Sequence, residues 1–168
     1  MSAEYLISSL QPIPFDGPAP VSRAEFRAAC RRELGFEPLS AGDNHAAARA
    51  WRDLETQLGN TCASERAKAL GVNGDKYLRP ADGCSLFWRG RIAAAFAEAD
   101  PLRRQSAIDR VYWDAAQELT PAADPLAVGA AYTYLVRLGI AERRARISAA
   151  EGNSVFDRIS DAQAMATR

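Results

Sequence analysis

The stretch SLFWRGRIAAAFAEADPLRRQSAIDRVYWDAAQEL, residues 85–119, gives the clearest prediction of the fold. Apolar residues recur every three or four positions on both sides of Asp100-Pro101, which is the spacing of one face of an α-helix. Asp100 can cap a helix and Pro101 suits its first turn, so the stretch predicts two consecutive helices. Thr120-Pro121 ends the second of them, because proline cannot continue a helix.

Helix signals towards the N-terminus follow the same rules. Ser22 and Glu25 have the spacing of a capping box, and Gly35 is a natural helix end, so a helix is predicted between them. A second helix is predicted over 43–58, where apolar residues again follow the helical period. The residues 60–84 are rich in turn-forming residues and are predicted to be an irregular connection, with a short helix through Ala63 to Leu70 as an alternative.

Towards the C-terminus the cap and first-turn proline occur again at Asp124-Pro125. They predict a helix that continues past Gly139 towards Arg146. A second capping box at 148–151 predicts one further short helix.

The N-terminal residues 1–21 are predicted to be a short extended Pro-rich arm. Tyr5–Leu10 is apolar and partly β-branched, which indicates at most one short strand. Four prolines between residues 12 and 20 exclude a helix there. We expect Ile13 and Phe15 to anchor the arm on the chain's own core, although recognition by another domain is an alternative.

Together these patterns predict an all-α bundle of five to six amphipathic helices that forms a single domain over residues 1–168. Apolar residues make up 48% and charged residues 25% of the chain, which is typical of globular proteins. Basic and acidic residues number 21 each, so no net charge favours nucleic acid or an anionic membrane. No nucleic-acid partner is predicted.

The cysteines and the first residues of the chain indicate the cellular compartment of the protein. Cys30, Cys62 and Cys84 are widely spaced and form no C-x-x-C pair, which suits thiols in a reducing compartment. The first ten residues lack the pattern of a signal peptide, and no apolar run is long enough for a membrane span. We expect a cytoplasmic protein without direct membrane insertion, with peripheral attachment at the inner membrane through partners as an alternative.

Few residues could support catalysis. His45, the single histidine, lies at a predicted helix start and is interpreted as a helix-end residue. The segment 71–76, GVNGDK, lacks the spacing of a phosphate-binding loop and indicates a turn. No enzyme activity, cofactor or metal site is predicted. An enzyme that uses carboxylates alone, such as Asp109 and Asp114, is an alternative, and it requires two close acidic groups in a deep pocket.

Aromatic residues are interpreted mostly as core. Trp88 and Trp113 each follow another aromatic residue, and adjacent aromatics cannot share one helix face. Either tryptophan could therefore be an exposed interface anchor, although the core interpretation is preferred.

The two ends of the chain resemble a family of bacterial proteins encoded with V/A-type rotary ATPases. Members typically open with Tyr-Leu-x-x-Ser-Leu-Pro, a Pro-rich turn and a Ser-x-x-Glu-Phe helix start. Here Tyr5–Leu10 is followed by Gln11 before Pro12, a departure at one position, and the helix start is present at 22–26. The segment 134–143, YLVRLGIAER, resembles the family's closing Tyr-Leu-x-x-Leu-x-Ile-x-Glu-Arg phrase, and Glu-Gly and an aromatic follow it here as in the family.

This resemblance implies a helical protein similar to the V/A-type ATPase component that couples the rotor shaft to the membrane ring and has no active site of its own. The chain is shorter than that component and would supply only part of its structure. We therefore expect a non-catalytic accessory or coupling subunit whose partners are central-stalk or membrane-ring subunits. A free-standing helical adaptor or regulator is the alternative.

Charged residues near the end of the helix predicted towards Arg146 are the candidate protein interface, because charges at a helix end can pair across an interface. Attraction of cations to the helix C-terminus explains the arginines equally well without a partner. The candidates are Arg137, Glu142, Arg143 and Arg144.

Overall fold

The computed structural model describes residues 3–147, and the regular structure in this range is entirely helical. The prediction of an all-α fold is confirmed for these residues. The α-helices are α1 (Ala3–Ser8), α2 (Arg23–Leu34), α3 (Ala46–Leu70), α4 (Leu86–Phe96), α5 (Pro101–Ala115) and α6 (Gly129–Arg146). Two short 3-10 helices are η1 (Asp75–Tyr77) and η2 (Ala116–Leu119).

The helix ends predicted at the Ser22–Glu25 capping box, at Gly35 and at Asp100 are confirmed. Both hydrogen bonds of the capping box between Ser22 and Glu25 are present at the start of α2. Gly35 ends α2 with a left-handed φ of 77°, a conformation that glycine adopts without a Cβ penalty. The Asp100 carboxylate accepts hydrogen bonds from the backbone N–H groups of Leu102 and Arg103 at the start of α5.

Helix α3 is longer than predicted, because Gly59 does not end it. The helix continues to Leu70, so the irregular connection predicted over 60–84 is wrong for residues 60–62, and the short helix considered for 63–70 is the last part of α3. A glycine inside a helix costs about 1 kcal/mol relative to alanine. Burial of Leu58 and Cys62 on either side of Gly59 offsets this cost.

The N-terminal arm is not extended throughout. Ala3–Ser8 forms the short helix α1, so the strand considered for Tyr5–Leu10 is wrong. The helical turn directs Leu6, which is 6% exposed, into a cluster with α2 and α6, and Leu10 packs against the same cluster. Farther along the arm, Ile13 and Phe15 pack against the core as expected.

Helix α6 begins later than Asp124-Pro125, where the sequence predicts a helix start. The Asp124 carboxylate accepts a hydrogen bond from the Leu126 N–H in a turn, and α6 starts at Gly129. A Cβ at Gly129 would lie 1.9 Å from the carbonyl oxygen of Leu119, so only glycine allows this approach to η2. The helix then continues past Gly139 as predicted, and the final helix predicted from residue 148 lies outside the described residues.

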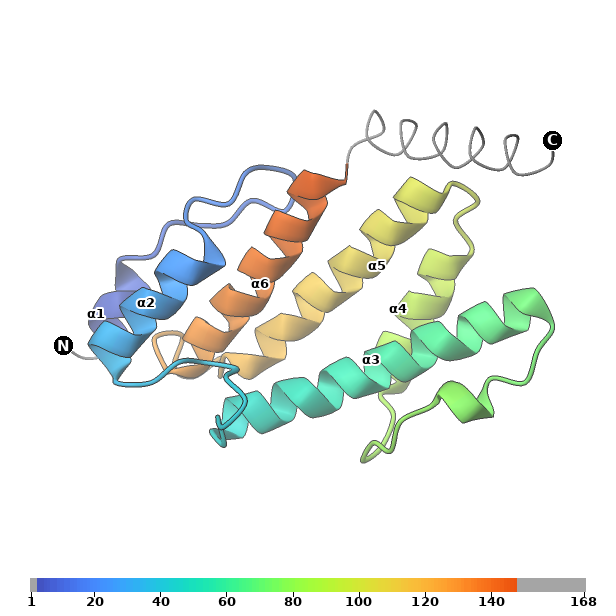
Figure 1. Cartoon of the computed structure of the whole chain (residues 1–168), viewed down its shortest axis with the longest axis horizontal. Helices are drawn as coiled ribbons and strands as arrows, with labels where there is room; N and C mark the ends of the chain where they lie inside the picture. Colours follow the sequence, from blue (N-terminus) through green and yellow to red (C-terminus); the bar gives the residue numbers. More distant parts are fainter. Residues whose placement is uncertain (1–2, 148–168) are drawn as a thin grey trace, which may run out of the picture.

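Helix α6 is the central element of the bundle (Figure 1), with α2 on one side and α5 on the other. One group of its buried residues packs with α1 and α2 in a small cluster made of Leu6, Phe26, Cys30, Ala131, Leu135 and Leu138. Another group packs with α3, α4, α5 and η2 in the larger cluster, which includes Trp51, Leu58, Ile92, Val111, Tyr132 and Ile140.

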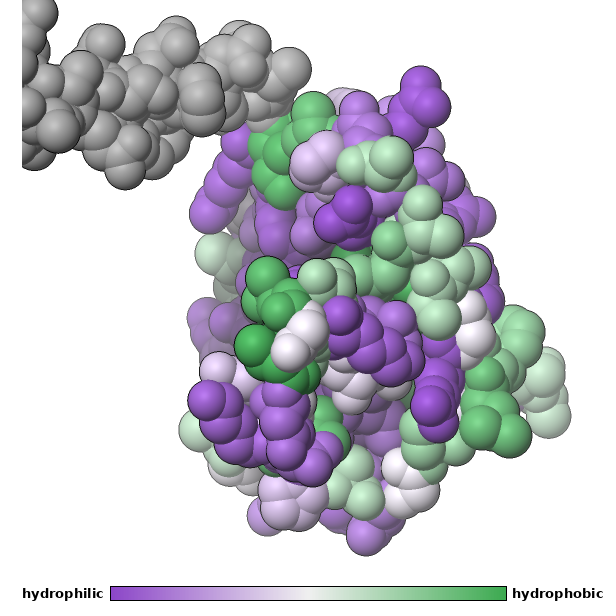
Figure 2. All heavy atoms as spheres, turned by 90° about the vertical axis from the view of Figure 1, so that its right-hand side faces the viewer, coloured by the Kyte–Doolittle hydropathy of each residue, from purple (hydrophilic) through white to green (hydrophobic). Residues whose placement is uncertain are grey.

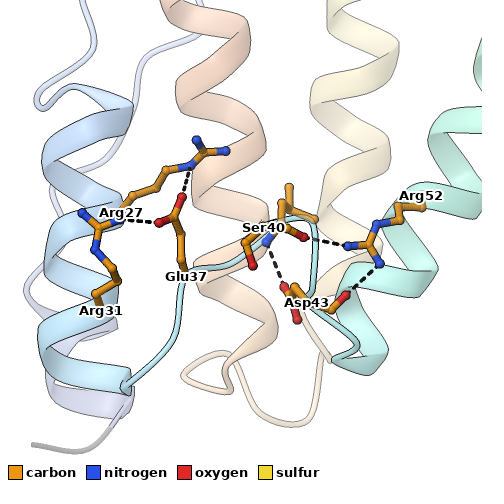
Figure 3. A network of polar contacts seen from close by, with 7 residues as sticks. Arg27, Arg31, Glu37, Ser40, Asp43 and Arg52 are labelled. Atoms are coloured by element: carbon orange, nitrogen blue, oxygen red, sulfur yellow. Dashed lines mark hydrogen bonds and ion pairs between the residues drawn. The ribbon is translucent and has the colours of Figure 1, made fainter.

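Charged side chains fix the loop between α2 and α3 at its first end (Figure 3). Glu37 of the loop forms ion pairs with Arg31 and, at 3.4 Å, with Arg27. Both arginines lie on α2, so these pairs hold the loop against that helix.

At its other end the loop is held by Arg52 of α3 (Figure 3). The guanidinium group donates hydrogen bonds to the backbone carbonyls of Ser40 at 3.0 Å and Asp43 at 2.8 Å. The Asp43 carboxylate in turn accepts a hydrogen bond from the Leu39 N–H at 2.8 Å. These bonds set the angle at which the chain enters α3.

Candidate functional site

The four candidate interface residues lie on α6, from its middle to its last turn, and each contacts another part of the chain. Glu142 Oε1 accepts a hydrogen bond at 2.7 Å from the backbone N–H of Arg23, the first residue of α2. A carboxylate at this position also interacts favourably with the positive end of the helix dipole. Glu142 therefore joins α6 to the N-terminus of α2.

Arg144 contacts the N-terminal arm and α5. Its guanidinium group donates hydrogen bonds to the Phe15 carbonyl at 3.2 Å, to Ser106 Oγ at 2.8 Å and to Asp16 Oδ1 at 2.5 Å. The guanidinium carbon also lies 4.0 Å from the centre of the Phe15 ring, a cation–π contact. Arg144 thus fastens the arm over the bundle.

Arg137 packs on Trp113 of α5. Its guanidinium carbon lies 5.1 Å from a Trp113 ring centre, and Nε donates a hydrogen bond to the Trp113 carbonyl at 3.3 Å. Burial lowers the pKa of Arg137, and the nearby Asp114 carboxylate opposes that effect. Arginine still stays charged under such conditions.

Arg143 forms an ion pair with Asp109 of α5, with 2.6 Å between Nη2 and Oδ1. Asp109 is 1% exposed, and the same oxygen accepts a hydrogen bond from Gln105 at 2.8 Å. The second oxygen, Oδ2, is buried and has no hydrogen-bond partner among the described residues. The pair therefore joins a buried carboxylate to an arginine side chain that is half exposed.

This ion pair lies in a cleft between α3, η1, α5 and α6. The cleft has a volume of about 670 Å³ and is lined mainly by polar side chains, among them Glu55, Asn60, Arg66, Arg79, Asp109 and Arg143. Burial raises the pKa of Glu55, whereas the charges of Arg79 and Arg143 oppose the rise. Three arginines and two carboxylates thus give the cleft a positive balance near neutral pH.

Cys62 and Tyr112 also line the cleft. Burial raises the pKa of the Cys62 thiol and that of the Tyr112 phenol, so both groups are protonated near neutral pH. A protonated thiol is a poor nucleophile. The arrangement can therefore present charge and hydrogen bonds to a bound molecule more readily than it can attack one.

The carboxylates named for an enzyme do not meet. Asp109 faces Arg143, whereas Asp114 pairs with Arg91 at 2.8 Å and with Arg110 at 3.2 Å. Glu55 is the carboxylate that shares the cleft with Asp109, and no sequence signal marks it because 54 residues separate the two. Within residues 3–147 no three His, Cys, Asp or Glu side chains are close enough to hold a metal ion.

The structure also decides the interpretations of the histidine and the tryptophans. His45 caps α3, with Nδ1 accepting a hydrogen bond from the Ala47 N–H at 3.1 Å, so its helix-end position is confirmed. Trp88 and Trp113 are 7% and 6% exposed, which confirms the core interpretation for both. The exposed aromatic side chain beside Trp88 is Phe87, at 64%.

No protein family, curated protein or solved structure matches the chain. Among residues 3–147, no helix combines the length and the hydropathy that a bilayer-spanning segment requires.

Proposed function

We propose that the chain is a non-catalytic accessory or coupling subunit of a bacterial V/A-type rotary ATPase. It binds central-stalk or membrane-ring subunits through its helices, on the cytoplasmic side of the inner membrane. The observation that carries the proposal is that the two sequence blocks that resemble the ATPase-associated family pack against each other.

The contacts between the two blocks are numerous and specific. The rings of Phe26 and Tyr134 lie 4.8 Å apart, and the Tyr134 hydroxyl donates a hydrogen bond to the Gln11 carbonyl at 3.0 Å. Glu142 accepts the hydrogen bond from Arg23 across a sequence separation of 119 residues. Two motifs far apart in sequence thus correspond to one continuous part of the fold.

The departure from the family phrase falls within this part of the fold. Gln11, which precedes Pro12 here, contributes its backbone carbonyl to the bond with Tyr134. This bond uses only the backbone carbonyl of the intervening residue, so it does not depend on the glutamine side chain. The structural unit built by the two blocks is therefore compatible with the departure.

Affinity purification of the tagged protein from its native cell in a mild detergent tests the proposal. We expect head, stalk or membrane-ring subunits of the ATPase to be recovered with it. Recovery of the protein alone, from an extract in which the ATPase is intact, would contradict the proposal. Specific recovery of a protein outside the ATPase would support the alternative, a helical adaptor or regulator.

A second experiment tests the α6 residues themselves. Charge reversal at Arg143 and Arg144 together should weaken assembly if these residues also contact a partner. Arg143 contacts α5, and Arg144 contacts both α5 and the N-terminal arm, so the thermal midpoint of each variant must be measured beside the purification. Arg146→Glu, which reverses an exposed charge on the same helix, is the matched control. Intact assembly with the Arg143→Glu, Arg144→Glu variant would exclude these residues from the interface.

A further inference from the structure

A second surface, at the far end of the bundle from the arm, has the features of a docking groove. It lies between the last turns of α3 and α4 and has a volume of about 680 Å³. Unlike the cleft beside Arg143, it is lined mainly by apolar side chains, including Ala69, Leu70, Ala93, Phe96 and Ala97. Figure 2 views the molecule from this end and shows apolar patches bordered by hydrophilic side chains.

The apolar lining is open to solvent. Leu70, which lines the groove at the end of α3, is 75% exposed. Complete burial of a leucine side chain contributes about 1.5–3 kcal/mol. A partner that covers this leucine would therefore gain binding free energy from its burial. Exposed apolar surface rimmed by polar residues is typical of protein interaction sites.

The rim of the groove is basic. Lys68 and Glu65 form an ion pair at 2.6 Å and balance each other's charge. Arg66 lies against the Phe96 ring at 5.8 Å, and Arg104 donates its hydrogen bonds to the backbone carbonyls of the residues just after α4 rather than to a carboxylate. Among the described residues no carboxylate forms an ion pair with Arg66 or Arg104.

We propose that this groove binds an amphipathic helix of a partner protein, with apolar residues towards Leu70 and Phe96 and acidic residues towards Arg66 and Arg104. The apolar walls come from two helices, and a third helix that lies between them buries them by ordinary ridge-and-groove packing. The two arginines select acidic flanking residues, because arginine pairs with carboxylates through two hydrogen bonds. The groove proposal rests on the proposed function in one respect only, which is that the chain has a protein partner.

A second copy of the chain fits the groove less well. A symmetric contact between two copies would bring the same surface of each molecule together. Arg66 and Arg104 of both copies would then face one another across the contact. The charges that favour an acidic helix therefore disfavour self-association here.

Photo-crosslinking in the native cell tests the proposal, with a photoreactive amino acid in place of Leu70. Leu86, a 77% exposed leucine at the start of α4, is the matched control position outside the groove. We expect a crosslink from position 70 to a segment of another protein with acidic residues flanking a helical apolar stripe. Arg66→Glu with Arg104→Glu should lower its yield at least tenfold, whereas Arg103→Glu should leave it unchanged.

Other results would overturn the proposal. These are a crosslink to residues 148–168 of the same chain, a crosslink to a second copy, or no product above that at position 86. A peptide synthesised from the captured segment then serves as the probe in fluorescence anisotropy with the purified protein. Its affinity should fall at least fivefold when its acidic residues are changed to glutamine, and an unchanged affinity would also contradict the proposal.

The same experiments separate this proposal from the ATPase role. If the captured helix belongs to a protein outside the ATPase and no ATPase subunit co-purifies with the chain, the groove assignment stands and the ATPase role fails. If ATPase subunits co-purify unchanged with a folded Leu70→Asp, Arg66→Glu variant, and no acidic helix is captured, the groove assignment fails and the ATPase role stands. Circular dichroism and the thermal midpoint establish that each variant is folded.

Discussion

The hydroxyl group of Tyr132 donates a hydrogen bond to Asp43 Oδ2 at 2.8 Å, across 89 residues of sequence. Tyr132 lies on α6 and is fully buried, and Asp43 is 9% exposed in the loop before α3. The same carboxylate accepts backbone hydrogen bonds from Leu39 and His45. One carboxylate therefore fixes the α2–α3 loop, the start of α3 and the central helix relative to one another.

Removing this hydroxyl should destabilise the protein. We expect Tyr132→Phe to lower the free energy of unfolding by about 1–3 kcal/mol, because hydrogen bonds to charged buried groups contribute that much. Urea denaturation followed by circular dichroism measures the change. Tyr77→Phe, at a ring that is 58% exposed, is the control and should change the free energy by less than about 0.5 kcal/mol. Equal losses for both variants would show that the bond to Asp43 adds no stability.

The Asp43 carboxylate should also make stability depend on acid pH. Burial alone would raise the pKa of Asp43, but hydrogen bonds from His45, Tyr132 and Leu39 and the charge of Arg52 together lower the pKa below its usual value. A carboxyl group with a lowered pKa in the folded state adds stability above its unfolded pKa of about 4, and that stability is lost as the pH falls through the folded pKa.

We therefore expect the free energy of unfolding to decrease as the pH falls below about 4 and through the lowered pKa of Asp43. Asp43→Asn should be less stable at pH 7 and should show a shallower decrease over the same interval. Urea denaturation at a series of pH values compares the two proteins. Parallel pH profiles would show that Asp43 does not contribute to the acid dependence.

Two glycines should respond in opposite ways to alanine. A Cβ at Gly129 would clash with the Leu119 carbonyl, so Gly129→Ala should destabilise by at least about 1–3 kcal/mol, as overpacking does. Gly59 lies within α3 with open space around it, so Gly59→Ala should stabilise by about 0.5–1 kcal/mol. Thermal unfolding measures both. A stabilising Gly129→Ala would show that α6 can move away from η2.

The same two glycines show what can be predicted from the sequence. Helix ends specified by neighbouring residues, such as the Ser22–Glu25 box and Asp100-Pro101, are predicted correctly because capping is a local interaction. Gly59 resembles a helix end, and the burial that outweighs its local preference comes from helices distant in sequence. Asp124-Pro125 misplaces the start of α6 for a similar reason, since Gly129 fits against η2.

The candidate site can be predicted only in part. Charge at a helix end identifies Arg137, Glu142, Arg143 and Arg144, and all four lie on α6. Their contacts with Trp113, Arg23, Asp109 and Phe15 span 24 to 129 residues, and helical periodicity does not indicate which helices meet. The groove beside Leu70 is not predicted, because its α3 wall falls in a segment whose turn-forming residues indicate an irregular connection.

The three cysteines should differ in reactivity. Cys30 and Cys62 are buried, and burial raises the pKa of Cys30 to about 11 and also raises that of Cys62. Cys84 is exposed. We expect one thiol per chain to react rapidly with a disulfide reagent at pH 8, since the reactive thiolate must form and be accessible. Cys84→Ser should abolish the rapid phase. Two or more rapid thiols would contradict the burial of Cys30 and Cys62.

The ion pair between Arg143 and Asp109 should contribute more to the free energy of unfolding than the exposure of Arg143 suggests. Arg143 is half exposed, so solvent screens its charge, but Asp109 is buried and depends on Arg143 and Gln105 for its hydrogen bonds. Arg143→Met keeps the alkyl stem and should lower the free energy of unfolding by about 1–3 kcal/mol, because it leaves a buried carboxylate short of a donor.

A double-mutant cycle measures the coupling between the two residues. Asp109→Asn added to Arg143→Met should cost less than the sum of the single changes, by about 1 kcal/mol. Arg146→Met, on the same helix but exposed, should cost less than about 0.5 kcal/mol. Urea denaturation of the double-mutant cycle measures the coupling, which should shrink in about 1 M NaCl as the charge on Arg143 is screened. Strictly additive losses would mean that the cleft between α3, α5 and α6 holds Asp109 without help from Arg143, and Arg143 would then be free to contact a partner.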